Sequence, residues 1–398
     1  MTNNGGVTVP FTPHIAVVGA GPVGLCAAQL LAQALPRAAV CVFDARPLDA
    51  DLTRDARTLA LGLGSVQLLQ RLEAWPSGAA EPITTISVSQ VPPGAAELRL
   101  TAAEMRAPLL GAVLAYGSVL GALQDAWLRQ QAAAPQRLRH QFGQRATGLK
   151  PLADGRVELD AGVAEAFDLV VLAEGGLFAD QAGRELRRDY GQTAWVGELR
   201  LGSGVPRGLA VERFTRSGPL ALLPLPDDAQ GRRAALVWCV TSADDPVAAL
   251  DDAQRLTALR SLFPPEARDL TGIGPLKAFP LGLNAERQQV QGRVVRIGNA
   301  SQTLHPVAGQ GLNLGLRDAV TLAHALRDAA DLGEGLARFQ RQRTPDRWML
   351  MGATDLFARG FAVDLPLATG LRELGLRAMQ HLPPLRQALA RQMMFGWR

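Results

Sequence analysis

The sequence predicts an α/β fold: a parallel-sheet domain that is discontinuous in sequence, an antiparallel sheet inserted into it, and a helical C-terminus. Two observations predict this arrangement. A buried strand, a glycine-rich turn and a helix follow one another at 14–35, and the same order returns at 293–318. Between them, 192–241 alternates as strands separated by turn residues. Parallel α/β pieces on both sides of an antiparallel stretch indicate one domain interrupted by another.

The composition is that of a globular protein large enough for more than one structural unit. The chain has 398 residues, of which 47% are hydrophobic and 20% charged. Its formal charge is +4, but Lys150 and Lys277 are the only lysines, and no basic run interleaved with aromatics occurs. We therefore expect no nucleic-acid partner. The unclustered Cys26, Cys41 and Cys239, and five histidines without ligand spacing, predict a reducing compartment and no metal site.

The apolar run at 14–35 is long enough on paper to cross a bilayer. Gly19, Gly21, Pro22 and Gly24 lie in its middle and divide it into a strand-like "HIAVV" and a helix-like "VGLCAAQLLAQAL". The preceding residues carry no positive charge, which a secretory signal requires. We interpret the run as a buried strand, turn and helix, and expect a cytoplasmic protein.

The pattern of apolar residues predicts the remaining elements in order. The predicted strands lie at 14–18, 39–43, 83–89, 96–100, 144–150, 156–160, 167–172 and 293–297. The predicted helices lie at 22–35, 64–73, 117–132 and 250–260. After Gly311 the chain is predicted to be helical almost to its end, with breaks at Pro345, Pro366 and the Pro383–Pro384 pair.

The turn "VVGAGPVG" has the glycine spacing of a dinucleotide-binding motif. Gly19 permits the tight turn, Gly21 lets the backbone approach a pyrophosphate, and Gly24 lets the helix pack on the strand. The helix N-terminus then offers free N–H groups to the pyrophosphate. Asp44 ends the second strand 20 residues beyond Gly24, where an acid accepts the ribose hydroxyls. Together these features predict an adenine dinucleotide site.

The second strand–loop–helix unit favours FAD over NAD. A cofactor with a reactive end far from its adenine explains why the chain returns to such a unit at 293–318. An isoalloxazine ring could lie against the bare backbone of Gly309 and Gly311. The helix that starts near Leu312 would point its N-terminus at the part of the ring where negative charge collects on reduction.

Other segments resemble those of a known family. The element "GNASQTLHPVAGQGLNLGLRD" (298–318) and the first glycine motif are similar to those of the single-component aromatic flavin monooxygenases. The segments "DARTLAL" (55–61), "ERFTRSGPLALLPL" (212–225) and "LVWC" (236–239) resemble the ubiquinone-biosynthesis hydroxylases, of the octaprenyl-methoxyphenol hydroxylase type. The likeness covers nearly the whole chain.

This resemblance implies a reaction. FAD is reduced by NADPH or NADH and forms a C4a-hydroperoxide with O2, which passes a hydroxyl group to a polyprenylated phenol. The chemistry belongs to the cofactor, while the protein binds, orients and excludes water. This explains why no catalytic dyad is visible in the sequence.

The resemblance also implies a domain plan: a Rossmann-like FAD-binding domain of the glutathione-reductase type, as in para-hydroxybenzoate hydroxylase, with an inserted antiparallel substrate domain. The FAD-binding domain is expected at 1–78, 111–185 and 276–330. The substrate domain is expected at 79–110 and 186–275, and the C-terminal helical region at 331–398.

The motif match assigns cofactor-binding roles. Gly19, Gly21 and Gly24 are expected at the pyrophosphate and Asp44 at the adenosine ribose. Arg57 is expected beside the flavin phosphate or ring edge, unless it is a surface arginine at a helix start.

Asn299 stands where the wider family has an aspartate on the ribityl chain. The residues expected against the isoalloxazine are Pro306, Gly309, Gln310, Gly311 and Asn313. His305 is either an acid/base or a packed, hydrogen-bonded side chain, so no catalytic residue is assigned.

Two departures leave an alternative open. Glu174, in "LAEGGLFAD" (172–180), replaces the aspartate of the family's "A-D-G-x-x-S" element, at a place linked to FAD and pyridine-nucleotide contacts. At 113–123 the polar residues of relatives are missing, and Ala115 and Ala122 stand there instead. An FAD-binding scaffold subunit with weak or no turnover would fit both departures. A flavin halogenase would need a W-x-W-x-I-P element, which the sequence lacks.

The C-terminal region interleaves Leu, Phe, Met and Trp with Arg at helical spacing. This pattern suits a basic amphipathic surface on an anionic membrane or on another ubiquinone-biosynthesis protein. An ordinary helix packed on the core would show the same pattern. Because a polyprenyl substrate resides in the bilayer, peripheral attachment to the inner membrane is the alternative to a purely cytoplasmic location.

Overall fold

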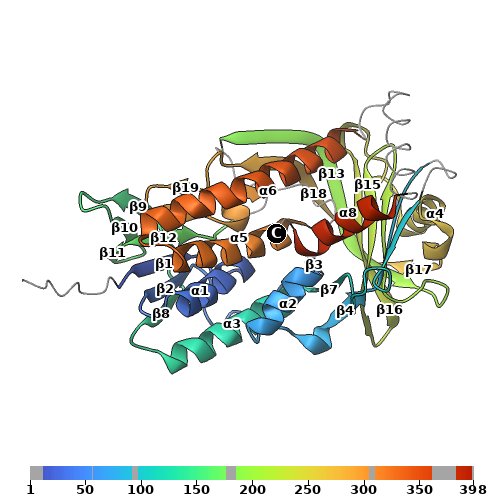
Figure 1. Ribbon diagram of the computed structural model, residues 1–398. Coiled ribbons are helices and arrows are strands. Elements are labelled where there is room, and N and C mark those ends of the chain that lie inside the picture. Colours follow the sequence, from blue (N-terminus) through green and yellow to red (C-terminus); the bar gives the residue numbers. More distant parts are fainter. Residues whose placement is uncertain are drawn as a thin grey trace, which may run out of the picture.

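The computed structural model describes residues 12–55, 57–91, 97–175, 185–303, 310–360 and 382–396. It contains a parallel sheet with its helices at one end of the molecule and a large antiparallel sheet at the other (Figure 1). The α/β fold with an inserted antiparallel sheet, predicted from the sequence, is confirmed.

The parallel sheet draws its strands from widely separated parts of the chain. Its order is β19 (Val290–Gln291), β20 (Val294–Arg296), β12 (Leu169–Leu172), β1 (His14–Val18), β2 (Ala39–Asp44) and β8 (Leu138–Phe142). All neighbours pair in parallel except β19 and β20. Because the central strands β12, β1 and β2 are buried on both faces, they are nearly continuous apolar runs such as "HIAVV".

Each face of this sheet has its own cover. One face packs against α1 (Pro22–Ala34), α3 (Tyr116–Ala133) and α5 (Gln310–Arg327). The other face packs against a three-stranded meander of β9 (Gly148–Pro151), β10 (Val157–Asp160) and β11 (Ala164–Phe167). The run at 14–35 is therefore a buried strand and helix, as predicted, and no helix among the described residues is long and apolar enough to span a membrane.

A second, small sheet lies beside α2 (Leu63–Arg71). It consists of β3 (Thr58–Gly62), β7 (Gly111–Ala115) and β4 (Ala80–Ile83), with β7 in the centre. The sequence analysis did not predict β3 or β7, nor β8 of the parallel sheet. Each forms only through pairing with a distant strand, which local periodicity does not show.

One face of the large sheet packs against α4 (Asp252–Leu262). The other face packs against the small sheet, which together with the parallel sheet and its helices forms the first domain. The strand order of the large sheet is β21 (Gln302–Thr303), β18 (Lys277–Ala285), β13 (Leu186–Leu201), β16 (Gly231–Thr241), β15 (Pro219–Asp228), β14 (Leu209–Phe214), β5 (Thr85–Gln90) and β6 (Leu98–Thr101), with β17 (Leu270–Ile273) also on β13. The alternation of strand side chains puts Val211 on the α4 side and Ala210 on the side that faces the first domain.

The C-terminal helices differ from the prediction at one proline. α6 (Leu332–Gly360) continues through Pro345, which was expected to break it. Pro345 is exposed, whereas Arg343, Asp346 and Arg347 beside it are buried. The hydrogen bond that proline removes is thus on the solvent side, where water can satisfy the freed carbonyl. α8 (Pro383–Phe395) begins at the predicted Pro383, and Pro366 lies outside the described residues.

All three cysteines are free and buried. Burial raises the pKa of the Cys26 thiol and of the Cys41 thiol to about 12, and it also raises the pKa of Cys239. These thiols stay protonated at neutral pH and act as small apolar core groups.

A buried charge cluster joins α5 to α6. The Arg343 guanidinium donates to Asp318 at 2.7 Å and to Asp346 at 2.6 Å, and all three side chains are almost inaccessible to solvent. The other oxygen of Asp318 accepts the backbone N–H of Gly298 at 3.1 Å. Arg347 donates to the carbonyl of Ser301 at 3.2 Å and to that of Glu286. The cluster therefore fixes the segment that follows β20 to the helix behind it.

Replacing Asp318 with alanine should destabilise the protein strongly, because it leaves Arg343 buried with one partner lost. Breaking a buried pair in this way costs about 3–5 kcal/mol. Urea unfolding followed by circular dichroism measures the change. The control is Asp328→Ala, which removes an exposed pair with Arg327 and should leave the unfolding midpoint unchanged. Equal midpoints for the two variants would show that the cluster contributes little.

Candidate cofactor site

The candidate site lies where parallel strands β1, β12 and β20 end side by side. Gly19 follows β1, Glu174 and Gly175 follow β12, and Asn299 follows β20 in a short 3-10 turn. A Cβ at Gly19 would lie 2.7 Å from the backbone nitrogen of Glu174, and one at Gly175 would overlap the Cβ of Asn299. Three predicted site segments, far apart in sequence, therefore meet at the carboxyl edge of the sheet, the usual ligand position in such folds.

The glycine turn has the geometry that its spacing predicts. Gly19 adopts φ +100°, and a Cβ at Gly24 would overlap the carbonyl oxygen of Gly19. At Gly21 a Cβ would have space, since the nearest atom is the Tyr116 hydroxyl at 3.6 Å. Among the described residues no side chain caps α1 at Gly21. Bare backbone and uncapped N–H groups fit a pyrophosphate at this helix N-terminus.

Asp44, at the end of β2, stabilises the glycine turn through hydrogen bonds of its carboxylate. One carboxylate oxygen accepts the N–H of Ala20 at 2.5 Å, and the other accepts the N–H of Arg46 at 2.7 Å. Its position beside the glycine turn fits the predicted ribose contact, since a carboxylate oxygen can accept more than one hydrogen bond. The ribose contact itself stays a prediction.

The N-terminal ends of α1 and α5 lie close together because glycines stand at their contact. A Cβ at Gly315 would lie 2.6 Å from a methyl group of Val23 and 3.0 Å from the Cα of Gly298. Gly298 itself adopts φ +58° against Val23. At Gly311, in the first turn of α5, a Cβ would meet no atom of the described residues within 4 Å. The open backbone at Gly311 fits the flat ring that the sequence predicts there.

Asn313 is a link between α5 and the small sheet. Its buried side-chain oxygen accepts the N–H of Gly62 at 2.9 Å and the Ser65 hydroxyl at 2.7 Å. Its amide donates to the carbonyl of Ala60 at 2.9 Å. Asn313 thus holds β3 and α2 against the start of α5, and its predicted contact with the isoalloxazine remains a prediction.

Arg57 precedes β3 rather than starting a helix. It is half exposed, pairs with Asp55 and lies over the Tyr116 ring at 4.0 Å from its centre. The hydrogen bond from Arg57 lowers the pKa of the Asp55 carboxyl. The Tyr116 hydroxyl would lie 3.6 Å from a Cβ at Gly21, so Arg57 and Tyr116 lie next to the predicted pyrophosphate turn. The sequence analysis missed Tyr116, although its place at the start of α3 was a usable signal.

Several predicted residues cannot be placed. His305, Pro306 and Gly309 lie outside the described residues, as do Leu177 and Phe178. Gln310 is the first residue of α5. The described elements β21 and α5 flank the segment 304–309.

The comparisons with known proteins agree with this geometry. An FAD-binding-domain family model matches residues 203–352, and a Rossmann-like NAD(P)-binding-domain model matches 17–48. The chain is 32% identical to a ubiquinone hydroxylase, UbiL, of Rhodospirillum rubrum, over 96% of this chain and 89% of that protein. It is 31% identical to the 3-demethoxyubiquinol 3-hydroxylase of Escherichia coli, over 94% and 97% respectively. The chain belongs to the FAD-dependent hydroxylases of ubiquinone biosynthesis.

A solved structure shares this fold. The HpxO protein of Klebsiella pneumoniae, complexed with FAD and uric acid, superposes with a TM-score of 0.72 at 18% identity, over 96% of this chain and 97% of that one. The family resemblance found in the sequence is confirmed, and so is an FAD-dependent monooxygenase with NADPH or NADH as electron donor. The individual site residues stay predictions, which the bare backbone at Gly21 and Gly311 fits.

The hydroxylase has an apolar pocket of about 60 Å³ beside Asn313. It is lined by residues of the first domain, of the large sheet and of α8: Ala60, Leu61, Gly62, Ile83, Ile86, Leu100, Leu110, Gly111, Asn313, Ala390, Met393 and Met394. Since Asn313 follows Gly311 within the first turn of α5, the pocket opens next to the predicted ring site. Its position between the domains is typical of substrate sites.

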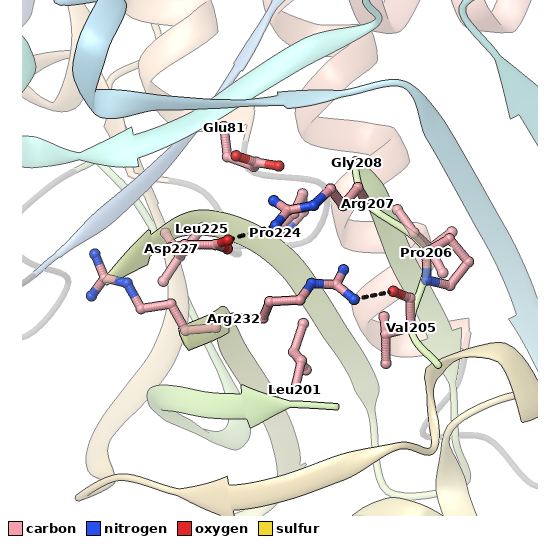
Figure 2. A pocket seen from close by; sticks show the side chains of 12 residues that line it. Glu81, Leu201, Val205, Pro206, Arg207, Gly208, Pro224, Leu225, Asp227 and Arg232 are labelled. Atoms are coloured by element: carbon pink, nitrogen blue, oxygen red, sulfur yellow. Dashed lines mark hydrogen bonds and ion pairs between the residues drawn. The ribbon is translucent and has the colours of Figure 1, made fainter. Parts of the chain in front are cut away.

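A second, polar cavity is structural. Figure 2 shows Glu81, Arg207, Asp227 and Arg232 around a space of about 10 Å³, enough for about one water. Arg207 pairs with Asp227 at 2.6 Å, and Arg232 donates to the carbonyl of Val205 at 2.6 Å (Figure 2). Burial raises the pKa of the Glu81 carboxyl. These paired charges tie the loop before β14 to the ends of β15 and β16.

Gly21→Ala should fold normally but bind FAD roughly tenfold more weakly or worse, because the added methyl group occupies the space over the turn while clashing with no protein atom. FAD fluorescence titration of the apoprotein measures the affinity, and circular dichroism measures the folding. Gly78→Ala, at an open surface position, should match the wild-type affinity. An unchanged affinity for Gly21→Ala would remove this turn from the cofactor site.

Proposed function

We propose that the chain hydroxylates the ring of a polyprenylated phenol in ubiquinone biosynthesis, with O2 and NADPH or NADH as co-substrates. The observation that carries the proposal is the apolar pocket beside Asn313. The pocket extends from the predicted ring site at the N-terminus of α5 to the apolar face of the large sheet. A phenol with an isoprenoid tail needs both a place beside the flavin and an apolar neighbourhood for its chain.

The protein's residues bind, orient and exclude water in this reaction. FAD, when bound, accepts electrons from the nicotinamide and activates O2 for insertion of one oxygen atom into the ring. The N-terminal end of α5 contributes its partial positive charge where the reduced cofactor is most negative. Asn313 and the buried cluster around Asp318 keep this end of the helix in place. Asn299 keeps the hydrogen-bonding reach of an aspartate without adding a charge beside an anionic cofactor.

The scaffold alternative keeps both of its supports. Val113, Leu114, Val119 and Leu123, in the apolar stretch at 113–123, are buried core residues of β7 and α3, so packing explains their apolar character. Ala115 is exposed and Ala122 is partly buried, so packing does not explain these two alanines. Glu174, exposed beside Gly19, is the other feature that favours weak turnover.

The purified protein should carry FAD and oxidise NADPH or NADH faster when a methoxyphenol is added. Under ¹⁸O2, mass spectrometry should find one ¹⁸O atom in the hydroxylated ring, because a monooxygenase takes a single atom from O2. Oxygen consumption without a phenol gives the uncoupled background. A yellow protein that never oxidises either donor, with or without phenol, would favour the scaffold subunit.

We propose further that the protein is cytoplasmic and binds the inner membrane peripherally. The substrate class supports this, and so do Trp348 and Met349, which are 44% and 41% exposed on α6, and Leu382, 52% exposed before α8. An exposed tryptophan on a helix that also carries arginines suits the interface of an anionic bilayer. Contacts with other ubiquinone-biosynthesis proteins are the alternative use of this surface.

Trp348→Ser should reduce the fraction of protein that co-sediments with vesicles containing phosphatidylglycerol, because the indole no longer inserts at the interface. Val163→Ser is the matched control, since Val163 is 80% exposed in the turn between β10 and β11. It should bind vesicles as the wild type does. Loss of binding in both variants, or in neither, would count against α6 as the membrane-facing element.

A further inference from the structure

The pocket beside Asn313 has one wall that differs from the others. Seven of its twelve lining residues belong to β3, β4, β5, β6 and β7, which are hydrogen-bonded into sheets. The wall that differs is the C-terminal half of α8, which contributes Ala390, Met393 and Met394. A helix that packs on a sheet edge can shift without breaking a strand ladder, whereas a strand cannot.

Gly62 and Gly64 let the last turn of α8 lie directly against the backbone where β3 meets α2. A Cβ at Gly62 would be 2.9 Å from the carbonyl oxygen of Met393, and one at Gly64 would be 3.1 Å from that of Met394. This contact places Met393 and Met394 at the pocket, which both residues line together with β3 and the large sheet. Met394 is buried in the same cluster as Ile83, Leu98 and Ala210.

Among the described residues, few ion pairs or side-chain hydrogen bonds connect α8 to the rest of the protein. Arg386 pairs with Glu104 at 3.3 Å, and both side chains are partly exposed. At the other end, Gly396, with φ +72°, packs against the Arg317 guanidinium. Partly exposed ion pairs stabilise little, so apolar packing is the main interaction that holds α8 against the pocket.

The pocket is small for the substrate it adjoins. Its volume is about 60 Å³, and it is open to solvent on one side rather than enclosed. An engineered cavity of about 150 Å³ binds benzene, and one isoprene unit has nearly as many carbon atoms. A prenyl unit can therefore lie fully inside the pocket only if the methionines change rotamer or α8 shifts. Methionine suits this role, because its unbranched side chain repacks at low cost.

We propose that this pocket binds the ring-proximal part of the substrate's isoprenoid tail, and that Met393 and Met394 of α8 form the yielding wall that determines which tail is accepted. The proposal rests on the proposed function, since it takes the polyprenylated phenol as substrate. It assigns to the C-terminal helix a direct share in substrate selection, separate from the flavin-binding residues.

The test compares a methoxyphenol without a tail and the same phenol carrying a farnesyl chain. Met393→Trp should raise the ratio of the KM for the prenylated phenol to that for the tail-less phenol by roughly tenfold, a change of about 1.4 kcal/mol in relative binding, because the indole fills the pocket. Met393→Ala should lower the same ratio. The control Val163→Trp, in the exposed turn between β10 and β11, should leave the ratio at the wild-type value.

A ratio that stays constant in both Met393 variants would overturn the proposal, as would a parallel change in KM for the two phenols. The alanine variant keeps the test valid if the tryptophan variant does not fold. Turnover of the farnesylated phenol by the wild type tests the proposed function on its own. If the wild type turns over neither phenol, the proposed function is wrong, whereas turnover with a constant ratio in both Met393 variants would overturn only the role of α8.

Discussion

The close contact between the first turns of α1 and α5 is the constraint on which the site depends. Val23 on α1 fits against Gly298 and Gly315, where any side chain would force the helices apart. This contact brings together two helix N-termini from opposite ends of the chain. Each end carries a partial positive charge, so together they suit a long cofactor that is anionic at both its phosphates and its reduced ring.

The buried charges behind this contact explain how an open backbone can be held rigid. The turn after β20 has little side-chain packing of its own, and Asp318, Arg343 and Arg347 replace it with charge-assisted hydrogen bonds. Polar groups so deeply buried are costly unless each finds a partner. Here their geometry fixes one arrangement of the segment that meets the cofactor, while apolar contacts alone would allow it to slide.

The sequence predicted the parts of the site whose geometry is local. Gly19, Gly24 and Asp44 act within one strand–turn–helix unit, so spacing along the chain was enough. The meeting of Glu174, Gly175 and Asn299 depends on the order of strands in a sheet, which was available only through the family resemblance. Tyr116 and β3 were missed because their roles arise from distant partners. Pro345 misled the prediction because its effect depends on which face of the helix is exposed.

The split construction of the parallel sheet has a consequence for biosynthesis. During translation β1, α1 and β2 leave the ribosome first, but β12 emerges much later and Gly298 later still. Even then the turn at Gly298 is not fixed until Arg343 on α6 arrives to pair with Asp318. Domains fold as units when their parts are complete. The parallel sheet therefore stays incomplete until the chain through α6 has been made. FAD can stabilise the native state only from that point on, because a ligand stabilises the state that binds it.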